Sequence, residues 1–422
     1  IDPTLSRDDF GNVQWVGALQ RRGGTYPLEN LAVAYNATGV VPVFVLNMTK
    51  YEPEEHIAEL RRAQRLGLPV RYVELGNEFY FGGGTQPAIE AKYPTPRSYG
   101  EDCNRWTAAL REAFPDVEVA IIGANLDGRR VSERRTNWNA ELAEADPTAD
   151  ALTLHLYIGT GLGALRDVMR LDDRDALLRA HWERFLKTDG ADEVIAQPRT
   201  AWNELRANTT IPEAPRDLWI TEFNLWDEVG AVQGTWAHGL CVAVFLDCFL
   251  GEPRVTRVHY HNFLANPRFT AVLDDGAFDY LPEDLRPQET VQKGALSAAG
   301  RVLALFGRAM ADAETVREIV LPDAAETRRR FGWCFETATT RRGIIANLEP
   351  TPLRTEAQMV GAVRVNFEIL AADPHTHITG DASLPTRAAS FAGLLDIPGY
   401  ALVLMEPATE QPDWRPSFPD VW

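Results

Sequence analysis

The sequence of 422 residues predicts an α/β fold, in which a (β/α)8 TIM barrel is followed by a C-terminal antiparallel β-sandwich domain. From about residue 40 to 265, short apolar runs rich in β-branched residues alternate with amphipathic stretches, which is typical of βα units around a parallel sheet. After about residue 309, segments alternate polar and apolar residues with no crossover helices between them. We therefore expect a barrel domain over 1–308 and a sandwich domain over 309–422.

Barrel strands are predicted where apolar runs are too short for helices and most are apolar on both faces. The six predicted strands are 40–47, 70–77, 117–124, 151–158, 218–223 and 255–263. A closed barrel needs eight strands, so two must come from residues 1–35 or be missing. The stretch 13–25 can supply one strand with a glycine turn. We expect the first barrel strand to lie wholly or partly before Ile1.

Crossover helices are predicted between the strands. Segment 51–69 carries Pro53 near its start, acidic residues in its first turn, apolar residues spaced for one face, and Gly67 as a stop. Segments 234–251 and 291–307 predict two more helices, both well buried.

Charge and hydropathy exclude two classes of partner. Lys and Arg number 42 against 60 Asp and Glu, which gives a formal net charge of -18. Such a field repels phosphate backbones, so we expect no nucleic-acid partner. No apolar stretch approaches the roughly 20 residues needed to cross a bilayer, so we expect a soluble protein without a membrane partner. Oligomeric state and localisation are left open, with a secreted or extracytoplasmic location slightly favoured.

The cysteines predict neither a disulfide framework nor a metal site. Two of them lie two turns apart on one predicted helix, about 10 Å, which is too far for a disulfide. No CxxC pair occurs, so free thiols are expected. The four cysteines are Cys103, Cys241, Cys248 and Cys334.

Two carboxylates end predicted buried strands. Glu78 directly follows strand 70–77, and Glu222 ends the apolar run of strand 218–223. The C-terminal ends of the strands form the active face of a barrel. Both side chains are therefore expected on one rim, from strands three apart.

Cleavage of a glycosidic bond needs two such carboxylates, one to protonate the leaving oxygen and one to act at the anomeric carbon. A separation of about 5–5.5 Å gives retention, and one of roughly 6.5–9.5 Å leaves room for an inverting water. Glu78 must hold its proton near neutral pH, which apolar Phe79 and Phe81 and a charged Glu222 favour. Glu222 must stay ionised, which a hydrogen bond from Tyr157 supports.

The sequence resembles a known clan at both carboxylates. The E-L-G-N-E of residues 74–78 and the I-T-E-F-N of residues 220–224 resemble glycoside hydrolase clan A, whose barrels carry an Asn-Glu acid/base pair after the fourth strand and a nucleophilic Glu after the seventh. The resemblance covers roughly residues 20–305, and a β-sandwich accompanies several clan members. The runs L-G-N-E-F-Y and E-F-N-L-W look most like α-L-arabinofuranosidases and heparanase-like β-glucuronidases.

The resemblance implies a retaining glycosidase that acts on an oligosaccharide, polysaccharide or glycoconjugate through a covalent glycosyl-enzyme intermediate, without a cofactor. It makes Glu78 the general acid/base and Glu222 the nucleophile. It implies that Asn77 hydrogen-bonds the sugar 2-hydroxyl, and that His155 and Tyr157 match a position that orients the nucleophile. The sugar, the linkage and exo or endo action are not implied.

Further substrate contacts are predicted near the strand ends. Tyr80 and Trp226 can stack on a sugar ring, although packing is the commoner fate of aromatic side chains. Asn47 ends the first predicted strand, and Asn224 and His261 complete the predicted set.

The sequence departs from the clan pattern at residues 259–262, where many members carry a Trp. Glu74 lies on the same strand face as Glu78 and is expected deeper in the barrel, paired with Arg21 or Arg22.

Two alternatives remain open on the sequence alone. One is a non-catalytic carbohydrate-binding relative of the same fold. The other is a metal-dependent barrel hydrolase that uses His155, His259 and His261. His259 and His261 alternate on one strand, and no third ligand has usable spacing, so no metal is predicted.

Overall fold

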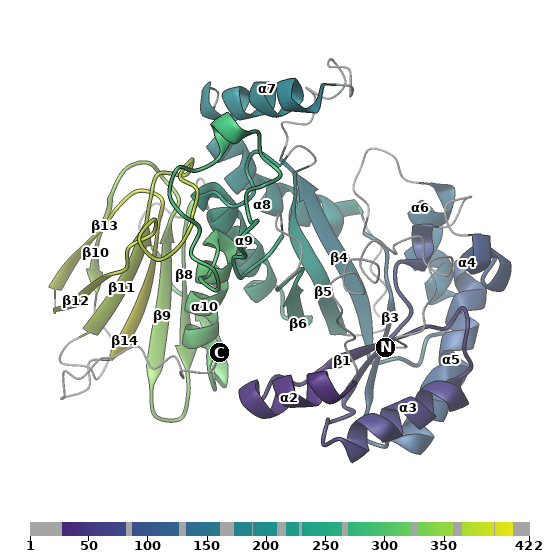
Figure 1. The fold of residues 1–422 in the computed structure, drawn as a ribbon. Helices are drawn as coiled ribbons and strands as arrows, with labels where there is room; N and C mark the ends of the chain where they lie inside the picture. Colours follow the sequence, from purple (N-terminus) through teal and green to yellow (C-terminus); the bar gives the residue numbers. More distant parts are fainter. Residues whose placement is uncertain are drawn as a thin grey trace. The chain divides into compact units, whose positions relative to one another are not determined.

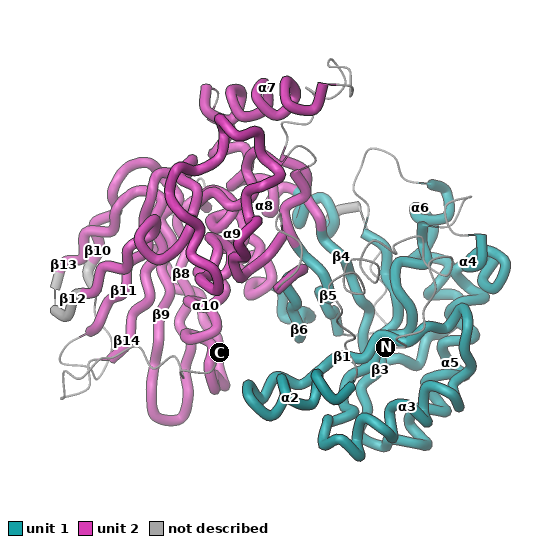
Figure 2. Tube along the Cα trace, in the orientation of Figure 1, with its two compact units in different colours: residues 1–156, 201–223, 252–260 teal, residues 157–200, 224–251, 261–422 magenta. Residues whose placement is uncertain are grey.

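The computed structural model divides into two compact units. Unit 1 comprises residues 1–156, 201–223 and 252–260, and unit 2 comprises the remainder (Figure 2). This division passes through two strands of the parallel sheet, and the domain boundary at residue 308 stays a prediction. The structure describes residues 28–81, 87–125, 132–160, 173–187, 189–208, 217–227, 230–263, 269–321, 328–357, 365–391 and 393–407.

Between residues 43 and 260 the chain forms a parallel sheet of six strands, which lie side by side in chain order (Figure 1). All six predicted strands are present. They are β1 (Val43–Leu46), β2 (Tyr72–Leu75), β3 (Glu118–Ile122), β4 (Ala151–Gly159), β5 (Asp217–Trp226) and β6 (Val255–Tyr260). The pairs β1–β2, β2–β3, β3–β4 and β5–β6 are parallel.

The closed eight-stranded barrel is not found in the described residues. There the sheet begins at β1 and ends at β6, and no pairing joins these two edges. Within the region 1–35, which was expected to supply strands, the described part belongs to helix α2 (Leu28–Thr38). The predicted strand 13–25, together with Arg21 and Arg22, lies outside the described residues.

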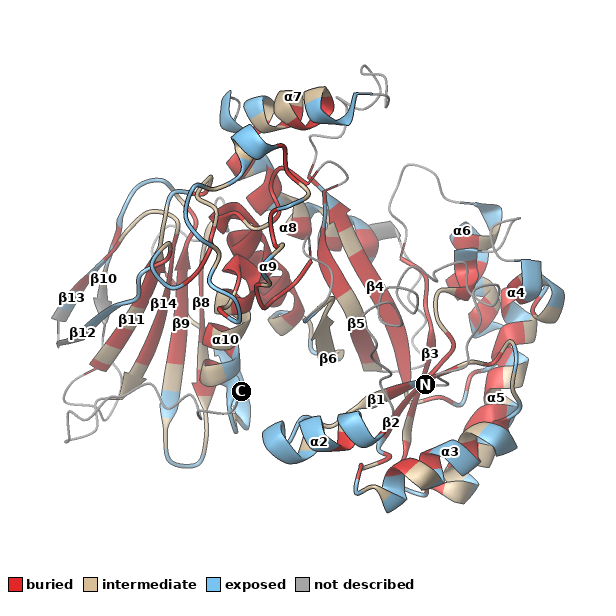
Figure 3. Cartoon of the chain, in the orientation of Figure 1, coloured by how far each residue is buried: buried red, intermediate tan, exposed pale blue. Residues whose placement is uncertain are grey.

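Helices of unit 1 cover the parallel sheet with their apolar faces. The helix predicted in segment 51–69 is α3 (Pro53–Arg65), with Pro53 in its first turn and Gly67 just after its end at a φ of 85°. Figure 3 shows its exposed residues on the side away from the strands. The other helices are α4 (Pro87–Lys92), α5 (Pro96–Ala113), α6 (Glu133–Ala143) and the short 3-10 helix η1 (Phe79–Phe81).

An apolar layer fills the amino-terminal part of the sheet. It is built from Tyr72, Ala120, Ala151 and Trp219, one residue from each of four neighbouring strands. The guanidinium carbon of Arg257 on β6 lies 3.4 Å from the centroid of the Tyr72 ring and closes this layer. Packed side chains thus occupy this end, as in a barrel core, and the carboxyl ends of the strands remain for a site.

Unit 2 contains the two predicted buried helices. They are α9 (Trp236–Leu250) and α10 (Ala298–Met310), which pack closely against each other. Helix α10 begins seven residues later than segment 291–307 predicts, because Gly294 has a φ of 80° and Ser297 caps the helix by accepting a hydrogen bond from Gly300 N at 3.2 Å. Unit 2 also contains α7 (Arg174–Lys187) and η3 (Glu283–Leu285), and the division between the units falls within α8 (Gly190–Asn208), after residue 200.

Antiparallel strands follow α10, as the period-two pattern predicts. A six-stranded sheet has the order β12-β11-β14-β9-β8-β7, and β10 pairs with β13 in a second sheet. Residues of both sheets, including Ile345, Phe367 and Leu395, share one apolar core. The strands are β7 (Thr315–Glu318), β8 (Arg330–Glu336), β9 (Arg341–Asn347), β10 (Leu353–Ala357), β11 (Val365–Ala371), β12 (Arg387–Phe391), β13 (Gly393–Ile397) and β14 (Ala401–Pro407).

All four cysteines are free thiols, as predicted. In the described part of the chain, no helix combines the length and the apolar character that crossing a membrane requires.

Candidate active site

Glu78 is placed by a tight turn after β2. Gly76 has a φ of 90°, and a Cβ there would lie 2.6 Å from the ring of Phe79, so only glycine fits. Glu78 itself has a φ of 53°. Residues other than glycine rarely adopt this backbone conformation, and where they do, it is often at a functional site. The Tyr99 hydroxyl secures the strand end by donating to Leu75 O at 2.6 Å and accepting from Ile122 N at 2.9 Å.

Glu222 is placed by an irregularity within β5 rather than at the end of the strand. Ile220 pairs with Val258 and Phe223 pairs with Tyr260, so β5 carries one residue more than β6 over this interval. Consecutive residues of a regular strand point to opposite faces. Here Thr221 and Glu222 both approach the same imidazole, as a bulge allows.

His155 on β4 lies between the two carboxylates. Its Nδ1 is 2.9 Å from Oε1 of Glu78 and 3.7 Å from Oε2 of Glu222. One carboxylate oxygen from each Glu and a ring nitrogen of His155 all lie within 4.8 Å of one another. The histidine is only 5% exposed, whereas both Glu side chains are partly exposed. The structure therefore brings together two carboxylates from β2 and β5, three strands apart.

The pKa values of His155 and Glu78 are shifted from their usual ranges. Burial lowers the pKa of His155, but the hydrogen bond with Glu78 and the charges of Glu222 and Glu74 outweigh burial and raise this pKa to about 9. Burial raises the pKa of Glu78, but its hydrogen bonds with His155 and Tyr80 and the charge of His155 hold it below its usual range. Tyr80 contributes by donating its hydroxyl to Oε1 of Glu78 at 2.9 Å.

The expectation that Glu78 has a raised pKa is therefore wrong. Phe79 packs on Tyr93 and Tyr99, with ring centroids 5.6 and 5.5 Å away, and Phe81 is 40% exposed. His155, which lies on β4, lowers the pKa of Glu78 through its hydrogen bond and its positive charge.

Glu74 lies on β2, four residues before Glu78. It is 2% exposed, and its Oε1 is 3.3 Å from Oγ1 of Thr221 and 3.9 Å from Nε2 of His155. Burial is the largest cause that raises its pKa, to about 7. The described partners of this carboxylate are thus hydroxyl groups and an imidazole.

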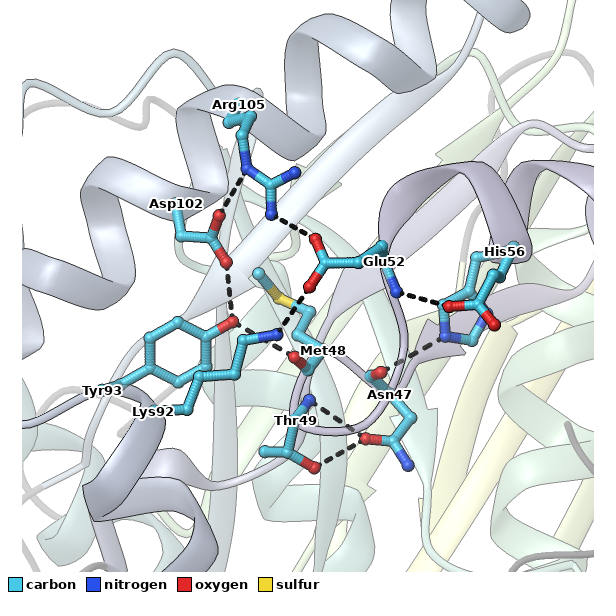
Figure 4. A network of polar contacts seen from close by, with 10 residues as sticks. Asn47, Met48, Thr49, Glu52, His56, Lys92, Tyr93, Asp102 and Arg105 are labelled. Atoms are coloured by element: carbon cyan, nitrogen blue, oxygen red, sulfur yellow. Dashed lines mark hydrogen bonds and ion pairs between the residues drawn. The ribbon is translucent and has the colours of Figure 1, made fainter.

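Asn47 and Asn77 follow β1 and β2. Asn77 is partly exposed beside Glu78. The Asn47 side-chain oxygen accepts from the backbone N and the hydroxyl of Thr49, at 3.1 and 2.8 Å (Figure 4). Its amide nitrogen is buried without a hydrogen-bond partner among the described residues, so this nitrogen is the group that Asn47 can offer to a ligand.

A polar network holds the loop after β1 (Figure 4). Glu52 contacts Arg105 at 2.7 Å and Lys92 at 3.3 Å. The Tyr93 hydroxyl donates to Asp102 at 2.8 Å and is 3.3 Å from Met48 O. These contacts tie the loop to α4 and α5, so the backbone that presents Asn47 is held in place.

The remaining predicted residues belong to unit 2. The Tyr157 ring lies 5.9 Å from the rings of both Trp226 and His261, and Trp226 is 48% exposed. Asn224 is fully buried, donates to His261 O and accepts from His238 Nε2, so its amide is committed to protein groups. The hydrogen bond from Tyr157 to Glu222 stays a prediction.

Sequence reasoning missed two residues of the site. Thr221 lies two residues after Trp219 and His155 four residues after Ala151, so strand alternation places both on the face of the apolar layer; the irregularity in β5 brings the next residue, Glu222, to the same histidine. Arg135 of α6 lies with its guanidinium carbon 4.8 Å from the Tyr80 ring centroid, and its charge lowers the pKa of Glu78. The only sequence signal for Arg135 was Ser132, whose hydroxyl caps α6 by accepting from Arg135 N.

Among the described residues, the group that could hold a metal ion is Glu78, His155 and Glu222. It differs from the histidine set His155, His259 and His261 that the metal-dependent alternative used.

Solved structures share this fold. The α-L-arabinofuranosidase of Thermotoga maritima is 13% identical with a TM-score of 0.56, over 89% of this chain and 77% of that chain. A family 51 α-L-arabinofuranosidase from Thermotoga petrophila is 13% identical with a TM-score of 0.57, over 92% of this chain and 79% of that chain. A 4-O-α-L-rhamnosyl-β-D-glucuronidase from Fusarium oxysporum is 12% identical with a TM-score of 0.52, over 90% and 79%.

No family model matches the sequence, and no curated protein sequence matches it. At these identities the structural similarity concerns the fold. The chain shares the fold of the family 51 glycoside hydrolases of clan A, as the resemblance of its two carboxylate motifs implied.

Proposed function

We propose that the protein is a retaining glycoside hydrolase in which Glu78 is the general acid/base and Glu222 the nucleophile. The observation that carries this proposal is the approach of the two carboxylates to within 4.8 Å, measured between one oxygen of each. Retaining glycosidases hold their carboxyl groups about 5–5.5 Å apart, and inverting enzymes need roughly 6.5–9.5 Å. The short separation supports direct attack on the sugar by one carboxylate.

The first step breaks the glycosidic bond. Glu222 attacks the anomeric carbon, and Glu78 delivers a proton to the leaving oxygen. In the second step, Glu78 takes a proton from water, and the water oxygen displaces Glu222 from the sugar. The configuration at the anomeric carbon is inverted twice and so retained.

His155 supplies the acid form of Glu78 in this scheme. The hydrogen bond at 2.9 Å between Nδ1 and Oε1 is short enough for direct proton transfer. Transfer breaks the Nδ1–H bond, forms an O–H bond on Glu78, and removes the positive and the negative charge together. A carboxylate whose pKa is lowered by an imidazolium can in this way still act as an acid.

The substrate class follows from the structural neighbours as part of the proposal. The solved structures of similar fold are named as α-L-arabinofuranosidases and as a rhamnosyl-β-D-glucuronidase. We propose O-glycosides in oligosaccharides, polysaccharides or glycoconjugates as substrates. Aryl α-L-arabinofuranosides and aryl β-D-glucuronides are the first compounds to test.

A panel of aryl glycosides tests the proposal with Glu78→Ala and Glu222→Ala. We expect hydrolysis by the wild type, loss of turnover in Glu222→Ala, and a kcat for Glu78→Ala that falls by roughly 10²–10⁴-fold with poor leaving groups. Glu118→Gln is the control, since Glu118 pairs with Arg257 outside the carboxylate group. Full activity of both alanine variants would remove the assignment, and an inactive wild type would favour a non-catalytic carbohydrate-binding protein.

A metal-dependent hydrolase is the second candidate, because Glu78, His155 and Glu222 offer ligand atoms within 4.8 Å of one another. Activity that chelators abolish and that a stoichiometric divalent metal restores would favour it over the glycosyl-enzyme route.

A further inference from the structure

Glu74 is a buried carboxylate that the proposed reaction does not use. It lies on β2 four residues before Glu78 and is 2% exposed. A buried carboxyl group needs hydrogen-bond partners, and here they are the hydroxyls of Thr221 and Thr153. Its position under His155 suggests a role in the site rather than in packing alone.

The hydrogen-bond chain from Glu74 has a defined direction. Thr221 Oγ1 donates to Oε1 of Glu74 at 3.3 Å and lies 3.1 Å from Nε2 of His155. A hydroxyl has one hydrogen, so once it donates to Glu74 it can only accept from His155. Nε2 of His155 must therefore carry a hydrogen.

This direction fixes which ring nitrogen exchanges a proton. With Nε2 always protonated, the neutral imidazole keeps Nδ1 free as an acceptor. Nδ1 is the atom that faces Oε1 of Glu78 at 2.9 Å and Oε2 of Glu222 at 3.7 Å. The opposite tautomer would leave the Thr221 hydroxyl without its donor and would block Nδ1.

We propose that Glu74 is a positioning residue that, through Thr221, holds the proton of neutral His155 on Nε2 and so reserves Nδ1 for proton exchange with Glu78. This inference rests on the proposed glycosidase function, because it assigns the source of the acid proton. The exchange moves one proton from Nδ1 to Oε1 of Glu78 and leaves the Nε2–H bond intact.

The groups around His155 are consistent with this assignment. Strand β2 contributes Glu74, the turn after β2 contributes Glu78, and β5 contributes Thr221 and Glu222. The carboxylates at Nδ1 and the hydroxyl at Nε2 give the two ring nitrogens different environments. Burial raises the pKa of Glu74 to about 7, below the pKa of about 9 of His155, so Glu74 is ionised and can only accept from Thr221 at a pH where His155 is neutral.

Three variants test the hydrogen-bond chain. Glu74→Leu removes the acceptor and keeps an apolar side chain of similar size, and Thr221→Val removes the bridging hydroxyl without a change of shape. Glu74→Gln keeps an acceptor oxygen for Thr221 and is the conservative variant. Asp247→Asn is the control for loss of a buried carboxylate, since Asp247 pairs with Arg199 and Trp333 instead.

The direct readout is the tautomer of His155, from the ¹⁵N chemical shifts of its ring nitrogens above its pKa. We expect the Nε2–H form in the wild type, Glu74→Gln and Asp247→Asn, and a mixture of tautomers in Glu74→Leu and Thr221→Val. In the last two we also expect kcat to fall roughly ten- to hundredfold, with KM changed by less than about twofold.

The proposal is overturned if Glu74→Leu and Thr221→Val keep the Nε2–H form and the wild-type kcat. Should Glu74→Leu fail to fold, Thr221→Val alone decides, because it preserves shape. The NMR signal needs no turnover, so a wild type that hydrolyses no glycoside would remove the proposed function while the tautomer of His155 could still be read.

Discussion

Replacement of Gly76 by alanine probes the turn that presents Glu78. The backbone at Gly76 has a φ of 90°, which costs an L-residue roughly 1–2 kcal/mol. The new Cβ would lie 2.6 Å from the ring of Phe79, which is fully buried and packed between Tyr93 and Tyr99. Overpacking of this kind costs about 1–3 kcal/mol. We expect Gly76→Ala to lose about 2–5 kcal/mol in total.

A matched glycine separates the two contributions. Gly67 has a φ of 85°, but a Cβ there would meet nothing within 4 Å. Gly67→Ala should therefore lose only about 1–2 kcal/mol, from the backbone alone. Urea unfolding of both variants measures the difference, and kcat should fall at least roughly tenfold in Gly76→Ala only, because Glu78 is displaced. Equal unfolding free energies for the two variants would refute the reasoning from the Phe79 contact.

Three further predictions follow from the structure. The pKa of His155 is raised from 6.5 to about 9, so protonation of His155 stabilises the fold fully below about pH 6.5 and this stabilisation is lost as pH rises through about 9. The difference in stability between wild type and His155→Gln, measured by thermal unfolding, should therefore shrink between these pH values. A constant difference would contradict this. Trp226 is 48% exposed, and Trp226→Ala should lower kcat/KM roughly tenfold without changing the urea midpoint. Phe263 is 59% exposed, and the control Phe263→Ala should change neither quantity. Equal effects of the two variants on kcat/KM would argue against a sugar contact of Trp226. Trp333→Phe removes the donor at 2.9 Å from the buried Asp247 and should cost about 1–3 kcal/mol in urea unfolding; an unchanged midpoint would show that Asp247 finds another partner.

The strands of the parallel sheet were predictable because burial on both faces leaves a simple mark in the sequence. Each of the six apolar runs became a strand, and Glu78 and Glu222 came from strands three apart as expected. The helix of segment 51–69 was equally predictable, since Pro53 and Gly67 mark its two ends. These features depend on residues close together in the chain.

The details of the site depend on residues far apart in the chain and were not predictable. The lowered pKa of Glu78 depends on His155, which β4 brings within 2.9 Å. The approach of Glu222 to His155, next to that of Thr221, depends on a shift in the pairing of β5 with β6, which period-two alternation cannot show. The start of α10 depends on the positive φ of Gly294. The helical pattern of segment 291–307 gives no sign of this backbone conformation, so it predicts a helix that starts too early.

Trapping of the glycosyl-enzyme tests the central claim most directly. A slow fluorinated glycoside of a sugar that the wild type accepts should leave one sugar covalently attached, and peptide mass spectrometry should place it on Glu222. A label on another residue, or a first product of inverted anomeric configuration by ¹H NMR, would contradict the assignment of Glu222 as nucleophile.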